Sequence, residues 1–244
     1  MRKQFYVAAA IKTLLALLLL AAWHGSQTIL DQAKRALGGT SFDRGHSLLQ
    51  PVNDFLHHHD RIANAVLILT SGHIDFVLCG MVLWGILGET IRPTIAIFFL
   101  LVFRQLSQLL VAEPVPSGMI WHYPGFPSLV VTYYTTFDFF FSGHTASATL
   151  SALEIGRRGY KNKIFVTLAV LMVLVEVLCI LSMRFHYTAD VITGTFASVT
   201  AFVLAEKLAP GLDVALQKAV YRLTSRFQYS PNWDRAPVVQ PIDQ

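Results

Sequence analysis

The chain has 244 residues, of which 54% are hydrophobic and only 14% are charged, and its mean hydropathy is +0.51. Soluble domains carry about a quarter charged residues, so this composition excludes an ordinary soluble domain and indicates one integral membrane domain. The net charge is a modest +4, and no nucleic-acid partner is expected. The two cysteines, Cys79 and Cys179, lie within apolar runs and are interpreted as small buried side chains.

Apolar stretches recur along the chain at lengths that suit about 30 Å of hydrocarbon. The first is interrupted only by Lys12 and no signal-peptide cleavage site follows it, so it is interpreted as an uncleaved span. The fourth is rich in Ser, Thr and Ala, which suits close packing inside a bundle. We therefore predict an all-α bundle of six transmembrane helices, at residues 5–23, 62–87, 91–110, 139–155, 164–183 and 190–208.

The remainder of the chain, after the sixth predicted span, divides into two segments. Residues 209–228 place apolar side chains at helical spacing and basic side chains on another face, which predicts a basic amphipathic helix on the cytoplasmic membrane surface. A helix packed on the cytoplasmic side of the bundle fits the same pattern. Residues 229–244 contain three prolines and are predicted to form a flexible tail.

Basic residues collect on one set of connections between the predicted spans. The connection from Val111 to Asp138 has no Lys or Arg, and the other connections on its side balance their basic residues with acidic ones. By the positive-inside rule both termini are predicted to be cytoplasmic. The basic flank residues outside the tail are Arg2, Lys3, Arg92, Arg157, Arg158, Lys161 and Lys163.

Two histidines, a carboxylate and an arginine are predicted to meet at the outer ends of the spans. His186 and Asp190 are four residues apart, so on a helical turn the carboxylate lies beside the imidazole and can fix its tautomer. His144 comes from another span and could donate a proton to a leaving oxygen. Arg104 has the fork of donors that matches a phosphate. The pattern favours phosphoryl transfer by histidine chemistry, with no metal and no cofactor.

The residues around the histidines resemble a known family. "DFFFSGHT" (138–145) and "HYTADV" (186–191) are similar to the D-x-x-x-S-G-H-T and H-Y-[ST]-x-D-V motifs of the sphingomyelin synthase family, within the lipid phosphate phosphatase (PAP2) superfamily. The segment 50–54 resembles the family's P-x-x-D segment, and Arg104 followed by "EPVPSG" resembles its Arg…Pro-x-Pro segment. The chain departs from the pattern at Thr136-Phe137, where the family has Cys-Gly.

This resemblance implies a lipid phosphatase-like fold and a catalytic triad of His144, His186 and Asp190. His186 would attack the lipid phosphorus and form a phosphohistidine, Asp190 would orient it, and His144 would protonate the departing oxygen. The donor would be a glycerophospholipid, and the acceptor ceramide or a similar lipid alcohol such as diacylglycerol. The substrate-binding candidates are Arg104, Asp138, Ser142, Gly143 and Arg184, and Glu113 is a further acid–base candidate.

Two alternatives stay open at the level of sequence. The same His-His-Asp site could use water as its acceptor, which would make the protein a lipid phosphatase or a phospholipase C-type hydrolase. The protein could also be a lipid-binding membrane protein that performs no reaction. In each case the site is expected on the exoplasmic, periplasmic or luminal face of the bilayer, and an oligomer is compatible with the sequence.

Three further stretches resemble functional motifs but are interpreted as structural. Ser71 to Asp75 repeats a Ser-Gly-His sequence near the middle of the second span, where a hydrogen-bonded pair inside the bundle is favoured over a site. His57-His58-His59 resembles a metal tract, but adjacent helical residues cannot all converge on one ion. Arg92-Pro93 resembles part of a phosphatase motif but is predicted to lie on the cytoplasmic side.

Overall fold

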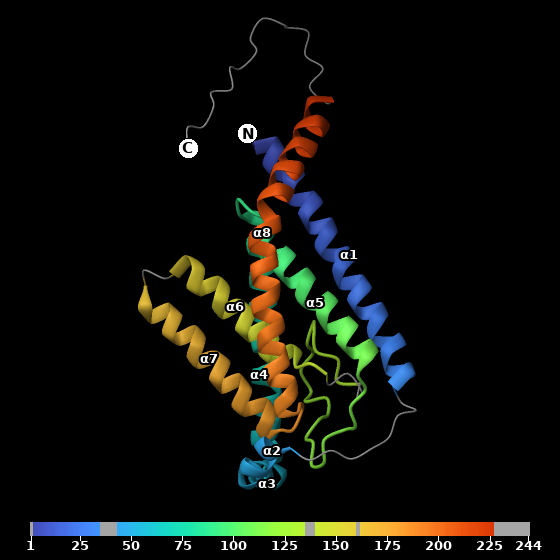
Figure 1. Ribbon diagram of the computed structural model, residues 1–244, viewed down its shortest axis with the longest axis vertical. Coiled ribbons are helices and arrows are strands. Elements are labelled where there is room, and N and C mark those ends of the chain that lie inside the picture. The colour runs from blue at the N-terminus through green and yellow to red at the C-terminus, as the bar shows by residue number, and fades with distance from the viewer. Residues whose placement is uncertain (1, 35–42, 135–139, 160–161, 227–244) are drawn as a thin grey trace, which may run out of the picture.

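The computed structural model describes residues 2–34, 43–134, 140–159 and 162–226. Within these ranges the regular secondary structure is entirely helical (Figure 1). The predicted tail at 229–244 and the candidate Asp138 lie outside the described residues. The helices are α1 (Arg2–Lys34), α2 (Arg44–Leu48), α3 (Gln50–His57), α4 (Asp60–Leu87), α5 (Arg92–Leu110), α6 (Gly143–Gly159), α7 (Lys163–Ser182) and α8 (Thr188–Arg226).

Among the described residues, five helices are long and apolar enough to cross a membrane: α1, α4, α5, α7 and α8. The predicted fourth span coincides with α6, which has only 17 residues and is rich in Ser, Thr and Ala. Most of its side chains are buried against neighbouring helices, including Thr145, Ala146 and Leu150. Because packing in the bundle replaces contact with lipid, α6 does not need a long apolar surface. The structure is thus an all-helical membrane protein, and the count of six spans stays a prediction.

The last helix continues past the end expected from the sequence. The sixth span was predicted to end at Leu208, before Ala209-Pro210, and a separate amphipathic helix was predicted to follow. The structure instead has one continuous helix, α8, with Pro210 inside it. A proline removes one backbone hydrogen bond from a helix, and the surrounding turns tolerate this loss where packing supports them. Ala205 and Ala209, in the turns just before Pro210, are buried in the core with α5.

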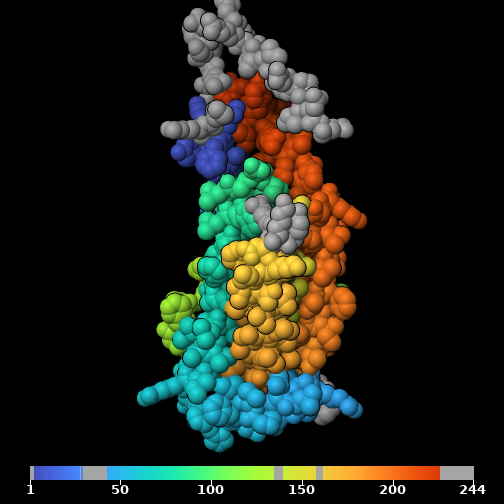
Figure 2. Space-filling view, turned by 90° about the vertical axis from the view of Figure 1, so that its left-hand side faces the viewer, coloured from blue at the N-terminus to red at the C-terminus, as the bar shows by residue number. Residues whose placement is uncertain are grey.

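The helices are arranged around α8, which runs along the length of the molecule (Figure 1). It packs on α5 and α6, while α7 covers the other side of α6 and α1 lies along α5, α4 and α8. The N-terminus and the end of α8 lie at one end of the molecule, and α2 and α3 lie at the other. Figure 2 shows α2 and α3 lying across the end of the bundle beneath α4 and α7.

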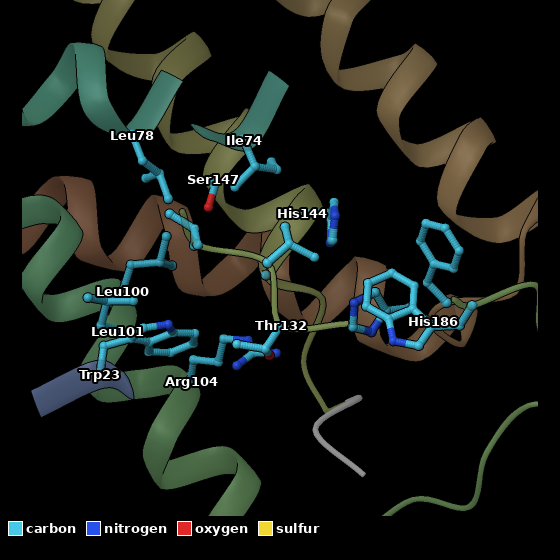
Figure 3. Close-up of a pocket in the computed structure, with 15 residues that line it drawn as sticks. Trp23, Ile74, Leu78, Leu100, Leu101, Arg104, Thr132, His144, Ser147 and His186 are labelled. Atoms are coloured by element: carbon cyan, nitrogen blue, oxygen red, sulfur yellow. The ribbon is translucent and has the colours of Figure 1, made fainter. Parts of the chain in front are cut away.

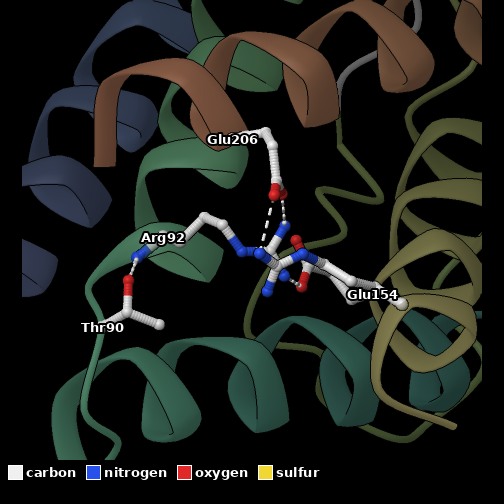
Figure 4. A network of polar contacts seen from close by, with 5 residues as sticks. Thr90, Arg92, Glu154 and Glu206 are labelled. Atoms are coloured by element: carbon white, nitrogen blue, oxygen red, sulfur yellow. Dashed lines mark hydrogen bonds and ion pairs between the residues drawn. The ribbon is translucent and has the colours of Figure 1, made fainter. Parts of the chain in front are cut away.

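The end of the bundle that carries the termini is held by a network of ion pairs (Figure 4). The Arg92 guanidinium donates to Glu154, and also to Glu206 at 3.3 Å. Arg157 donates to Glu206 at 2.6 Å. These bonds join the beginning of α5 to α6 and α8. Arg92 therefore lies far along the helices from the predicted histidines, and its contacts are structural.

Polar side chains within the first and second apolar helices also have partners. The Lys12 ammonium donates to the carbonyl oxygens of Ile86 and Gly88, at 3.4 and 3.1 Å. Nδ1 of His73 lies 3.0 Å from Oε2 of Glu176, which joins α4 to α7. His73 thus has a hydrogen-bond partner inside the bundle, as expected, but the partner is Glu176 on α7, which the sequence did not identify.

Candidate functional site

The two predicted catalytic histidines come together at the junction of α6, α7 and α8. His144 is the second residue of α6, and His186 lies in the turn between α7 and α8. The centroids of the two imidazole rings are 6.2 Å apart, and both side chains are largely buried. Two side chains separated by 42 positions in the sequence thus face one another at the described site.

The position of His144 follows from the way in which α6 begins. The Ser142 hydroxyl accepts a hydrogen bond from the backbone N–H of Thr145 at 3.2 Å, which caps the helix. The Ser142 N–H in turn donates to the carbonyl oxygen of Asp190 at 3.1 Å. A side chain at Gly194 would clash with the Ser142 carbonyl oxygen, 2.7 Å from the Cβ position. The start of α6 is therefore fixed against the start of α8, and Ser142 positions the histidine through the backbone.

Asp190 holds both the start of α8 and the second histidine. Its Oδ2 accepts from the backbone N–H of Tyr187 at 2.8 Å, so the carboxylate caps its own helix. The same oxygen lies 3.7 Å from Nδ1 of His186. This distance is longer than a hydrogen bond but within the range of a charge interaction. The carboxylate is completely buried, so its attraction to an imidazole proton is screened little by water.

Glu113, on the segment after α5, lies against Asp190. A hydrogen bond joins the two side chains. Because two carboxylates cannot donate to each other, this bond requires a proton on one of them. The Tyr187 hydroxyl also donates to the Pro114 carbonyl oxygen at 3.0 Å, so the segment after α5 is fixed against the site.

Arg104 is carried by α5 and lies next to the start of α6. Its guanidinium lies over the Trp23 ring, 5.0 Å from the centroid. A Cβ at Gly143 would lie 2.9 Å from Nε of Arg104, so only glycine lets this arginine approach the start of α6 so closely. Gly143 thus admits the Arg104 cation next to His144, and its predicted contact with the substrate stays a prediction.

A pocket of about 70 Å³ lies between these groups. His144, His186 and Arg104 face it from different sides (Figure 3). Apolar and aromatic side chains of α1, α4, α5 and the segment before α6 form the rest of its wall. A small polar centre with an apolar surround is typical of a site for the reacting part of a larger ligand. The chains of a lipid would have to leave such a pocket toward the surrounding bilayer.

The structure places Arg184 outside the wall of this pocket. Its backbone has a φ of 58°, and its guanidinium donates to the Ser117 carbonyl oxygen and to the Gln50 side chain. Asn53 adds hydrogen bonds to the carbonyl oxygens of Gly118 and Ser182, at 3.1 and 2.8 Å. The segment 50–54 and Arg184 thus tie α3 to the loop after α5. We assign Arg184 a structural contact here, and its predicted contact with phosphate stays untested.

The structure adds a histidine that the sequence did not single out. Nε2 of His46 lies 2.8 Å from the carbonyl oxygen of His186, and its ring lies against that of Tyr187. Asp43 accepts hydrogen bonds from His46 and from both the N–H and the hydroxyl of Thr188. Burial raises the pKa of the Asp43 carboxyl, but these hydrogen bonds outweigh it and hold the pKa below its usual value of 3.8. The short helix α2 therefore supports the turn that carries His186.

One wall of the pocket is formed by the segment before α6, and α4 anchors this segment. The Asp75 carboxylate accepts hydrogen bonds from the Ser128 hydroxyl and from the N–H groups of Leu129 and Val130, at 2.9–3.0 Å. The Tyr133 hydroxyl donates to the Ser71 hydroxyl at 2.6 Å. Ser71 and Asp75 of the second Ser-Gly-His motif therefore hold this wall of the pocket in place, a role that the sequence did not predict.

Replacing Asp75 with alanine is expected to release this wall. Hydrogen bonds to a carboxylate contribute about 1.5–3 kcal/mol each, so their loss should raise amide hydrogen exchange across residues 128–131 at least about tenfold. Asp75→Asn keeps an acceptor oxygen and should restore most of the protection. Hydrogen exchange followed by mass spectrometry measures both, with the exposed Asp54→Ala as control. Equal exchange in wild type and Asp75→Ala would contradict the anchor.

The described residues contain no group of three or more His, Cys, Asp or Glu side chains placed to hold a metal ion. In the histidine tract, rings bond to nearby backbone oxygens. His58 and His59 contact the carbonyl oxygens of Asp54 and Phe55, at 2.7 Å each. The interpretation of this tract as structural agrees with these contacts.

The fold and the site together define a helical membrane protein with paired histidines at one end of the bundle. The family model described as AtPDCT1/2 matches residues 42–207, which is most of the chain and contains Arg104, His144, His186 and Asp190. The chain therefore belongs to the AtPDCT1/2 family. This is a family of phosphatidylcholine:diacylglycerol cholinephosphotransferases, so the chain is placed among membrane enzymes that act on lipid headgroups. Comparison with curated proteins and with solved structures gives no match.

This family membership corrects the assignment expected from the sequence. The chain is not a member of the sphingomyelin synthase or PAP2 families, so ceramide loses its support as the acceptor. The expectation rested on short motifs around two histidines. Such motifs describe a reaction centre, and enzymes with different lipid acceptors can share one. The chain also departs from the pattern of the first family at Thr136-Phe137.

Proposed function

We propose that the protein transfers phosphocholine from phosphatidylcholine to diacylglycerol, at the site that contains His144, His186 and Asp190. The observation that carries the proposal is the pairing of two buried imidazoles across one pocket, 6.2 Å apart, in a chain of this family. The reaction exchanges one diacylglycerol for another on the same headgroup, so it needs neither a redox cofactor nor net hydrolysis.

In the first half of the proposed reaction His186 attacks the phosphorus atom through its Nε2. The bond from phosphorus to the diacylglycerol oxygen breaks, and His144 gives that oxygen its proton. Asp190 lies 3.7 Å from Nδ1 of His186 and would hold the ring in the tautomer whose other nitrogen has a free electron pair. This distance is expected to shorten when a substrate fills the pocket.

In the second half a new diacylglycerol occupies the place of the first. Its hydroxyl loses a proton to His144, its oxygen attacks the phosphorus, and the bond to His186 breaks. The histidine and its partner then return to their starting states, so protons and bonds balance over the cycle. Arg104 would contact the phosphate oxygens, since it lies beside the start of α6 and faces the same pocket as both histidines.

The proposal places this chemistry on the face of the membrane opposite the termini. The basic residues flank the helices at the end with the termini, and the two histidines lie toward the other end. A lipid could reach the site from the outer leaflet with its headgroup in the pocket and its chains in the bilayer.

A panel of acceptors tests the proposed function. Purified protein would receive phosphatidylcholine with a deuterated headgroup, together with diacylglycerol of different chain length, ceramide, or no added acceptor. Mass spectrometry should then find the labelled headgroup on the added diacylglycerol. Labelled sphingomyelin or free phosphocholine as the main product would contradict the proposal, because it would show a ceramide or a water acceptor.

A further inference from the structure

The two ends of phosphocholine carry opposite charges and need different kinds of contact from a protein. The phosphate is an anion and accepts hydrogen bonds, whereas the trimethylammonium group is a cation that can donate none. Proteins bind such a cation with carboxylates or with the faces of aromatic rings. Of the described residues that line the pocket, none is Asp or Glu. Aromatic rings are therefore the groups in this wall that suit the ammonium cation.

Three aromatic side chains line the pocket: Trp23, Trp121 and Phe185. Trp23 is already covered by the guanidinium of Arg104, which lies 5.0 Å from its centroid. A second cation there would meet the charge of the arginine. The Trp23 side of the pocket thus suits the phosphate anion, and the cation must lie elsewhere.

The other two rings lie on the side of His186. Phe185 precedes His186 directly, and its ring centroid is 4.7 Å from that of Trp121, at an interplanar angle of 72°. The Trp121 ring also lies 5.1 Å from that of Tyr133, which extends the cluster. Figure 3 shows Trp23 and Arg104 on one side of the pocket and His186 on the other. A headgroup with its phosphorus at His186 and its phosphate toward Arg104 would therefore direct its ammonium toward this cluster.

The aromatic cluster is held in place from both ends. Phe185 is only 2% exposed and belongs to the core between α4 and α7. The backbone N–H of Ile120, next to Trp121, donates to the Met183 carbonyl oxygen at 2.9 Å. The Tyr133 hydroxyl is bonded to Ser71. A cation site needs rings with fixed orientations, because the attraction depends on the position of the charge over the ring face.

We propose that Trp121, supported by Phe185 and Tyr133, forms the subsite for the quaternary ammonium group of the phospholipid donor. The proposal rests on the proposed function and assigns it a headgroup preference. A trimethylammonium group keeps most of its attraction to the rings because it is weakly hydrated. A primary ammonium, as in phosphatidylethanolamine, would lose water hydrogen bonds that the rings cannot replace. The pocket should therefore prefer choline to ethanolamine.

Competition between two donors tests this subsite without turnover. In the His186→Ala background, the protein would be offered equal amounts of phosphatidylcholine and phosphatidylethanolamine with identical chains, and native mass spectrometry would give the ratio bound. Trp121→Leu should lower the choline-to-ethanolamine ratio about tenfold. Trp121→Phe should lower it less, about threefold, because phenylalanine attracts cations less strongly than tryptophan.

The ethanolamine lipid serves as an internal control for folding, and Trp84→Leu is the matched control. Trp84 is partly buried like Trp121 but lies near the far end of α4, so its loss should leave the ratio unchanged. An unchanged ratio in both Trp121 variants, or equal binding of the two lipids by the parent protein, would overturn the subsite. If headgroup transfer occurs nonetheless, the proposed function stands without it. Choline preference without transfer would overturn the function and keep the subsite.

Discussion

Replacing His186 with alanine is expected to reduce headgroup transfer at least about 10³-fold, because the reaction then lacks its nucleophile. Replacing His144 should reduce the rate about 10²–10⁴-fold, since the pocket and the nucleophile remain but the proton donor is gone. Both rates would be measured by mass spectrometry, as labelled phosphatidylcholine formed from an added diacylglycerol.

His58→Ala is the matched control for these variants. His58 is exposed just after the end of α3 (Gln50–His57), at the same end of the bundle, and its ring bonds to the Asp54 carbonyl oxygen of α3 at 2.7 Å. The control should keep wild-type activity. Undiminished transfer by His186→Ala, at equal amounts of folded protein, would rule out this histidine as the nucleophile.

Replacing Glu154 with glutamine is expected to be the most destabilising of the changes discussed. The side chains of Arg92 and Glu154 are only 4% and 1% exposed, so the change removes the buried anion of a buried guanidinium and leaves it only the more exposed Glu206. Breaking such a pair typically costs about 3–5 kcal/mol. Glu206 in the same network is 43% exposed, and Glu206→Gln should cost about 1 kcal/mol or less.

Denaturation of the purified protein in mixed detergent micelles measures the two free energies of unfolding. The double variant Arg92→Leu with Glu154→Leu should recover most of the stability lost by Glu154→Gln, because it removes both buried charges. Equal losses for Glu154→Gln and Glu206→Gln would contradict the importance of burial in this network.

The sequence could predict that the two histidines lie close together, because this depends only on the number of membrane crossings and on short sequence spacings. The lengths of the apolar stretches decide how often the chain crosses the bilayer, and each crossing decides the side on which a residue emerges. Asp190 could be paired with His186 because four residues separate them in a helical segment. Local spacing and topology are sufficient for both predictions, and the structure brings His144, His186 and Asp190 together.

The supporting contacts could not be predicted in this way. Asp75 binds a loop that lies more than fifty residues further along the chain, and His46 bonds to the backbone of His186 across 140 positions. Neither contact produces a recurring pattern of residues in the sequence. His73 and Glu176 were each expected to need a polar partner, because both are costly to place in an apolar helix. Their depth in the membrane did not show that they are partners of each other.

The end of the last helix and the family of the chain also could not be predicted from local sequence patterns. Pro210 suggested an end to the sixth span, yet α8 continues through it, and Ala205 and Ala209 are buried in the turns before it. The histidine motifs pointed to the wrong family, because residues that perform a reaction say little about which lipid accepts the headgroup. Acceptor choice depends on the shape of the space beside the site, to which residues distant in sequence contribute.

The most direct test of the central claim is an initial-rate study with both lipids varied. Transfer through a covalent bond to His186 requires the first diacylglycerol to leave before the second reacts. Plots of reciprocal rate against reciprocal phosphatidylcholine fraction, at several diacylglycerol fractions, should therefore give parallel lines. Intersecting lines would show that donor and acceptor must be bound together, and would contradict a phosphohistidine intermediate.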